Sequence, residues 1–80
     1  MTEKKHLADN LIVFRKHAKM SQTVFAKHTK LSRGIVSLVE CQSSNIRLGN
    51  LIKLVSFMGI TVSDVFTKDY VKNNLESQDE

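Results

Sequence analysis

The sequence has 80 residues, of which 41% are hydrophobic and 25% are charged, and its formal net charge at pH 7 is +4. A chain of this length forms a single domain with a small core, which excludes a separate ligand-sensing domain and argues against a large enzyme pocket. It has no run of about 18 apolar residues, so no membrane span is expected. Its single cysteine and the absence of a signal-peptide pattern at its start predict a protein of the reducing cytoplasm.

The charges are unevenly distributed along the chain. Residues 10–63 contain eight lysines or arginines and a single acid, Glu40, for a net charge of +7, whereas residues 64–80 carry −3. A strongly basic globular segment favours a polyanion, such as nucleic acid, as the partner. The alternative is that the charges serve solubility and that their asymmetry is random.

Helical spacing of apolar residues predicts an all-α fold of five short helices, since the sequence lacks proline and shows no sustained alternation typical of strands. The first helix is predicted over residues 5–19. Ser21 is expected to cap a second helix, which ends near His28 and turns Val24 and Phe25 inward.

The third predicted helix follows after a connection of only three or four residues. Ser32 is expected to cap it, Glu40 ends it, and Val36 and Val39 share one face because they are three positions apart. Helices this short are not stable alone and must pack against the rest of the chain. A short helix, a tight turn and a second, steeply inclined helix form a helix-turn-helix, whose second helix fits a DNA major groove about 12 Å wide.

The fourth helix is predicted near residues 47–58, with Gly59 as the left-handed residue that ends it. Its broad apolar face consists of Leu48, Leu51, Ile52, Leu54, Val55 and Met58. Ser63 is expected to cap a fifth helix. We therefore expect a helix-turn-helix DNA-binding domain over residues 1–66 and a short acidic C-terminal extension over residues 67–80 that is partly helical or frayed.

Several runs of the sequence, taken in order, resemble the lambda-repressor-like (XRE/Cro type) DNA-binding family. They are Met20-Ser21-Gln22-Thr23-Val24-Phe25-Ala26, then Leu31-Ser32-Arg33, Val36-Ser37-Leu38-Val39-Glu40 and Asn50-Leu51-Ile52-Lys53-Leu54. The resemblance covers about residues 7–66 and implies a compact five-helix DNA-binding domain with the helix-turn-helix at its second and third helices. Within the family, the small size and the region from Glu40 to Leu51 resemble the controller proteins of restriction–modification systems.

The resemblance implies that the third helix reads DNA bases. Arg33 is the strongest base reader there, because its planar guanidinium can donate to guanine O6 and N7 together, which is worth about 1–3 kcal/mol of discrimination. Ile35 and Leu38 lie off the face formed by the two valines, where they can meet thymine methyl groups. The expected base-contacting residues are Ser32, Arg33, Gly34, Ile35, Ser37 and Leu38. The expected phosphate-contacting residues are Gln22, Thr23, Lys27, Ser43, Ser44, Asn45 and Arg47.

Arg15 and Glu40 match a pair that forms an internal salt bridge in members of this family. The charges agree, because an unpaired Glu40 on this basic surface would repel phosphate, so we expect a structural ion pair. The sequence departs from the family pattern at several positions, among them Cys41-Gln42, where a glycine is usual after Glu40, and Ile46, where a proline often precedes the fourth helix. The turn lacks its usual glycine, so Lys30 or a neighbour is expected to have a positive φ. Gly34 costs a helix about 1 kcal/mol relative to alanine and is expected to permit close approach to DNA.

The remaining apolar residues near the end of the chain indicate a homodimer. They are Phe57, Ile60, Val62, Val65, Phe66 and Tyr70. A symmetric dimer places two recognition helices about 34 Å apart, which matches a palindromic DNA site. The alternative is that these residues only seal a small core.

These patterns predict a sequence-specific regulator of transcription that binds double-stranded DNA as a homodimer on a palindromic operator, either a controller protein or a small repressor. The alternative is an antitoxin-type protein-interaction module that also binds DNA, with a toxin or RNA polymerase as candidate protein partners. Catalysis is not expected, since no nucleophile–base set, paired carboxylates or phosphate-binding glycine loop appears. Cys41 is expected to be a structural thiol, and the spacing of the three histidines is not that of metal ligands, so we expect no metal, cofactor or small-molecule substrate.

Overall fold

The computed structural model describes residues 2–42 and 46–78, and the side chains of residues 4–42 and 46–75. The helices, in chain order, are α1 (Thr2–His17), α2 (Gln22–Thr29), α3 (Arg33–Glu40), α4 (Leu48–Met58), α5 (Val62–Val65) and α6 (Tyr70–Gln78). The described residues contain no strand, which confirms the all-α prediction. Among them, no helix has the length and apolar content needed to cross a membrane.

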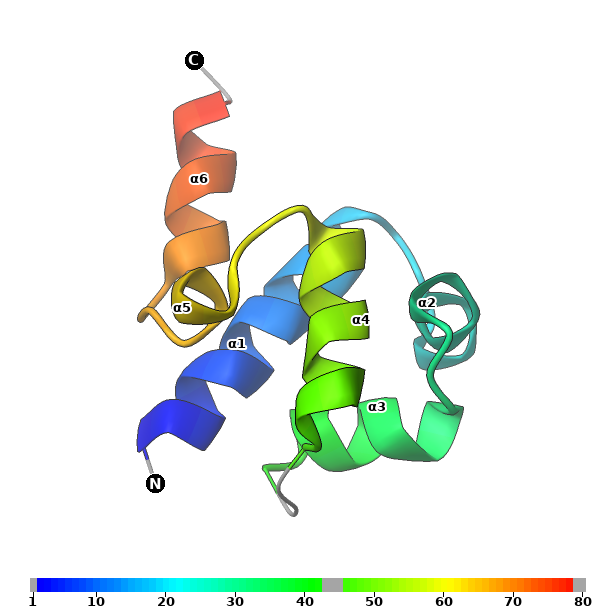
Figure 1. Cartoon of the computed structure of the whole chain (residues 1–80). Helices are drawn as coiled ribbons and strands as arrows, with labels where there is room; N and C mark the ends of the chain where they lie inside the picture. The colour runs from blue at the N-terminus through cyan, green and yellow to red at the C-terminus, as the bar shows by residue number, and fades with distance from the viewer. Residues whose placement is uncertain (1, 43–45, 79–80) are drawn as a thin grey trace.

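Two helices, α1 and α4, occupy the centre of the molecule in Figure 1. The α2–α3 pair packs on one side of them, and α5 and α6 pack on the other (Figure 1). In this view α2 is seen along its axis while α3 runs across the lower edge, so the two helices are steeply inclined to one another. This is the helix-turn-helix arrangement that the spacing of apolar and capping residues predicts.

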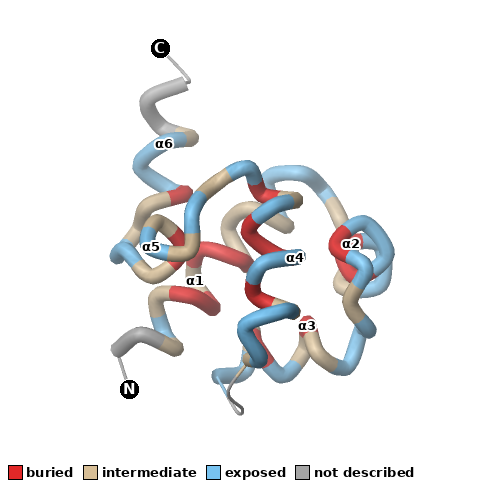
Figure 2. The backbone as a smooth tube through the Cα atoms, in the orientation of Figure 1, coloured by how far each residue is buried: buried red, intermediate tan, exposed pale blue. Residues whose placement is uncertain are grey.

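The buried side chains form one core between these helices, and Figure 2 shows the buried segments of α1 and α4 at the centre of the molecule. The core residues are Leu7, Leu11, Phe25, Ala26, Val36, Val39, Leu51, Leu54, Val55, Met58, Val65 and Val71. Rings of Phe14, Phe25 and Phe57 meet edge to face beside it, with centroids 5.7–6.2 Å apart. Such aromatic pairs add about 0.5–1.5 kcal/mol each beyond the burial of their surface.

Several predicted helix ends are confirmed by their caps. Ser21 Oγ accepts a hydrogen bond from the Val24 amide, and Ser32 Oγ accepts one from the Ile35 amide. Gly59 ends α4 with a φ of 74°. Lys30 ends α2 with a φ of 62°, as expected for a turn without its glycine. The local polar residues therefore determine where these helices begin and end.

The predicted number of helices was too low, because the C-terminal residues form a separate sixth helix. Asp69 has a φ of 54°, which interrupts the helical backbone between α5 and α6, and the side chain of Val71 is buried in the core. The predicted cap of α5 was also wrong. Thr61, not Ser63, caps this helix, because only Thr61 has an acid three positions later, Asp64, to complete a reciprocal capping box.

Three apolar side chains predicted to face inward are exposed. Val24 is exposed because Phe25, Ala26 and Thr29 already fill the buried face of α2. Leu48 and Ile52 are 67% and 48% exposed, because the buried face of α4 consists of residues 51, 54, 55 and 58. The apolar surface of α4 is thus wider than the face that the monomer buries.

Asn10 is a buried polar residue that the sequence patterns did not reveal. Its side-chain amide donates to the backbone oxygens of Val65 at 2.7 Å and Thr67 at 2.9 Å, and its oxygen accepts from the Val71 amide at 3.1 Å. One side chain of α1 thereby forms hydrogen bonds with the backbone of both α5 and α6. Its hydrogen-bonding groups are all used, as burial of an amide requires.

Candidate nucleic-acid interface

The turn between α2 and α3 is fixed from within the protein. Thr29 is buried, and its hydroxyl lies 3.0 Å from the backbone oxygen of Phe25, to which it donates. The Leu31 amide donates to the backbone oxygen of Ala26 at 2.9 Å, which the left-handed conformation of Lys30 permits. Three residues therefore suffice to turn the chain from one helix into the next.

The α3 helix has a buried face and an exposed face, as its sequence predicts. Val36 and Val39 are in the core, whereas Arg33 and Gly34 are exposed at its first turn and Leu38 is 46% exposed. Ser37 is half-buried between these two faces. The start and outer face of α3 thus carry one arginine, a glycine and an apolar side chain toward solvent.

Two of the six expected base-contacting residues have other roles in the monomer. The hydroxyl oxygen of Ser32 accepts the capping hydrogen bond of α3 at 3.2 Å. Ile35 is half-buried and packs against the core, so it offers less apolar surface to a ligand than Leu38 does. The expected reading surface is therefore reduced mainly to Arg33, Gly34 and Leu38, with Ser37 at its edge.

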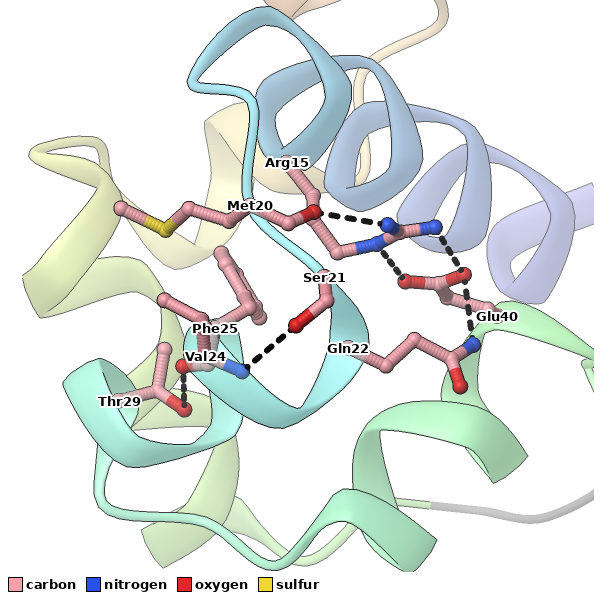
Figure 3. Close-up of polar contacts among 8 residues, drawn as sticks. All are labelled: Arg15, Met20, Ser21, Gln22, Val24, Phe25, Thr29 and Glu40. Atoms are coloured by element: carbon pink, nitrogen blue, oxygen red, sulfur yellow. Dashed lines mark hydrogen bonds and ion pairs between the residues drawn. The ribbon is translucent and has the colours of Figure 1, made fainter.

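A charged junction holds α2 and α3 against the end of α1 (Figure 3). Arg15 donates from Nε to Glu40 Oε2 at 2.6 Å and from Nη2 to Glu40 Oε1 at 3.0 Å. Its Nη1 also donates to the backbone oxygen of Met20 at 3.0 Å. Gln22 Nε2 donates to Glu40 Oε1 at 3.1 Å. The ion-pair side chains are only 14% and 7% exposed, so solvent and salt screen this pair weakly.

The ion pair in this junction neutralises the one acid near the surface of α2 and α3. Glu40 is the only acid in residues 10–63, and its carboxylate is already used by Arg15 and Gln22. The exposed charges around α2 and α3 are therefore positive. They include Lys27 and Arg33. A polyanion meets no unpaired acid among the described residues of this segment.

The expected phosphate-contacting residues lie in three different situations. Thr23 and Lys27 are exposed on α2, whereas Gln22 is half-buried and held by Glu40. Arg47 is exposed at the start of α4, and its side chain makes no capping hydrogen bond to that helix. Ser43, Ser44 and Asn45 lie outside the described residues.

The six residues expected at a dimer contact are not brought together on one surface. Ile60 and Tyr70 line a groove of about 420 Å³ beside α6, and Val62 and Phe66 are partly buried nearby on the α5 side. Phe57 instead lies toward α2, where the His28 ring stacks on it at 5.5 Å. Val65 is fully buried within the monomer. Its side chain has no exposed surface in the monomer, whereas the other five predicted residues are partly exposed.

No metal-binding cluster of three or more His, Cys, Asp or Glu side chains occurs among the described residues. Cys41, expected as a structural thiol, lies exposed just after α3.

Comparison with solved structures finds a close likeness over nearly the whole chain. A crystal structure of the hypothetical transcription factor NHTF from Neisseria matches with a TM-score of 0.79 and 28% sequence identity, covering 94% of this chain and 84% of that chain. No protein-family model matches the chain, and no curated protein matches it. The chain therefore has a fold similar to that of a protein described as a transcription factor.

Proposed function

We propose that this protein is a sequence-specific regulator of transcription that binds double-stranded DNA. The exposed first turn of α3, with Arg33 at its start and no unpaired acid nearby among the described residues, carries the proposal. The likeness to a hypothetical transcription factor supports it, because that likeness includes nearly all of this chain. No catalytic step belongs to this function.

In this function α3 enters the major groove. Arg33 donates to a guanine, and Leu38 packs on a thymine methyl group. Lys27, Thr23 and Arg47 contact the flanking phosphates, which hold the helix in register without reading sequence. Gln22 has a smaller part in phosphate binding than its position suggests, because one of its amide hydrogens already serves Glu40.

The proposal includes a homodimer on a palindromic operator, as in the lambda-repressor-like family that the sequence resembles. The partly buried residues beside α5 and α6 offer the contact surface. They are Ile60, Val62, Phe66 and Tyr70. Symmetric pairing through this surface would repeat the α2–α3 pair on both halves of a DNA site. A controller protein or small repressor acts in this way through its own concentration, without a ligand-sensing domain.

Selection of binding sites from a pool of random duplex DNA tests the proposal. The expected result is a palindromic consensus, bound with an affinity that falls with a slope of about 0.9 per neutralised phosphate when the logarithm of salt concentration rises. Sedimentation of the free protein tests the dimer separately. Equal binding to all sequences would contradict the specific regulator, and a monomer at high micromolar concentration would contradict the dimer.

A further inference from the structure

A second surface of the molecule, distinct from the exposed face of α3, combines apolar and positively charged groups. It is a groove of about 350 Å³ between the end of α2 and the middle of α4. Its lining residues are His28, Thr29, Lys30, Ile52, Lys53, Ser56 and Phe57. We refer to these seven residues as the α2–α4 groove.

The apolar part of the α2–α4 groove is open to solvent. Ile52 is 48% exposed, and Leu48, one helical turn earlier on α4, is 67% exposed. The His28 ring stacks on Phe57 with an interplanar angle of 17°, so two aromatic side chains form a flat wall. Exposed large apolar side chains next to a concave surface are typical of sites where a protein segment binds.

The charged part of the groove has one sign. Lys30 and Lys53 are exposed at its rim, and none of the seven lining residues is acidic. Lys30 has a left-handed backbone conformation in the turn that follows α2, and its side chain is exposed. The groove therefore favours a ligand that carries acids around an apolar group.

This combination favours a peptide segment over DNA as the occupant. No α3 residue lines the groove, and a DNA backbone presents charged phosphates and small sugars rather than a large apolar side chain that would fill the space beside Ile52 and Phe57. The acidic end of this chain also lacks an apolar anchor of its own. Leu75, its last large apolar residue, already packs against the core, and α6 lies far from α2 in Figure 1.

We propose that the α2–α4 groove binds an acidic segment of another protein, with one or two large apolar side chains seated between α2 and α4 and its carboxylates facing Lys30 and Lys53. The observation that carries this is that Ile52 is exposed in a groove whose lysines, Lys30 and Lys53, are not accompanied by any acidic lining residue. An amphipathic helix with acids beside its apolar face has the required chemistry. The binding does not depend on the DNA-binding function proposed above.

Selection from a displayed library of random peptides about 12 residues long, with the full chain as target and no DNA present, tests the proposal. Enriched peptides are expected to combine aspartate or glutamate with leucine, isoleucine or phenylalanine. The best peptide is then synthesised, and its affinity is measured by fluorescence polarisation for the unaltered protein and for Lys53→Glu and Ile52→Ser.

Lys53→Glu and Ile52→Ser are each expected to weaken the peptide about tenfold. Lys16→Glu is the matched control, because it makes the same charge change at an exposed site on α1 that does not line the groove, and it should alter affinity less than about twofold. Circular dichroism of each variant verifies that it is folded; both altered groove side chains are exposed, so the helical signal should be unchanged.

Four results would overturn the proposal. The first is a selection without an acidic–apolar consensus, and the second is an equal loss of peptide affinity in Lys16→Glu and Lys53→Glu, which would indicate an effect of net charge alone. The third is displacement of the peptide by random-sequence duplex DNA, which would show that the groove binds phosphate. The fourth is equally tight binding of a synthetic peptide of residues 69–80, which would make a second copy of this chain the occupant. A failure of sequence-specific DNA binding would leave all these measurements interpretable.

Discussion

The two sides of the molecule are fastened to α1 by different chemistry. On the α2–α3 side, Arg15 uses an ion pair whose side chains remain 14% and 7% exposed. On the α5–α6 side, Asn10 uses a neutral amide that is 1% exposed and makes three hydrogen bonds to backbone groups.

The choice between a charged and a neutral group depends on how deeply each interaction is buried. A charge at the position of Asn10 would cost several kcal/mol of desolvation with only backbone groups to compensate it. At the edge of the α2–α3 pair, a charged group costs less, and the pairing removes the one acid from a surface proposed to meet phosphate. The interaction on the α5–α6 side thus contributes to stability alone, whereas the ion pair on the α2–α3 side also keeps the charge of the neighbouring surface positive.

Removing the buried amide tests the α5–α6 side and is expected to have the largest effect. Asn10→Ala should lower the free energy of unfolding by about 4 kcal/mol, because three backbone groups lose a partner in the core. Urea unfolding followed by circular dichroism measures this change. Asn74→Ala, on an exposed position of α6, is the control and should change stability by less than about 0.5 kcal/mol.

Removing the arginine tests the opposite side. Arg15→Ala should lower the free energy of unfolding by about 3 kcal/mol, because the mostly buried carboxylate of Glu40 loses its ion-pair partner and keeps, among the described residues, the hydrogen bond from Gln22. Urea unfolding again provides the measurement, and Lys16→Ala, its exposed neighbour on α1, is the control. If Arg15→Ala leaves the free energy of unfolding unchanged, the ion pair does not stabilise the fold as the hydrogen bonds of Asn10 do.

Arg33, an exposed side chain on the α2–α3 side, is expected to affect DNA binding without affecting stability. Arg33→Ala is expected to cost about 2 kcal/mol of discrimination at one base position per half-site, because a bidentate contact with guanine is lost. Its free energy of unfolding should change by less than about 0.5 kcal/mol, since the side chain is exposed. Competition binding with single-base variants of the selected site measures the first effect. A uniform loss across all sequences would instead make Arg33 a phosphate contact.

Gly34→Ala should produce the smallest effect and the opposite sign in stability. A Cβ at this position meets only Ser32 Oγ at 3.9 Å, so the free protein should gain about 0.7 kcal/mol of helix stability. DNA binding should weaken if α3 approaches the bases as closely as we propose. Gly49→Ala is the matched control, because a Cβ there meets nothing within 4 Å. It should stabilise similarly in thermal unfolding without altering the preference among DNA sequences.

The helix-turn-helix could be predicted from sequence because its limits are set locally. Ser21 and Ser32 cap the two helices, and Val36 and Val39 mark the inner face of the second. The cap of α5 was missed because two hydroxyl residues lie two positions apart, and only the acid that follows Thr61 at the right spacing decides between them.

The C-terminal side was harder to predict, because long-range contacts determine it. Asparagine is usually a surface residue, and Asn10 is buried because it forms hydrogen bonds with backbone groups 55–61 positions away. The α6 helix has few apolar residues, and Val71 is its only described residue that is fully in the core. The exposure of Leu48 and Ile52 likewise depends on which face of α4 the other helices cover, which spacing alone does not specify.

The separation between Asn10 and Val71 has a consequence for the order in which the chain folds. Arg15 and Glu40 are 25 positions apart, whereas Asn10 and Val71 are 61 positions apart, so the contact on the α2–α3 side closes a much shorter loop. Contacts of long sequence separation require more loop-closure entropy and form late. We therefore expect a folding transition state in which the α2–α3 side is structured and α6 is not, so that changes at Asn10 mainly accelerate unfolding while changes at Arg15 also slow folding.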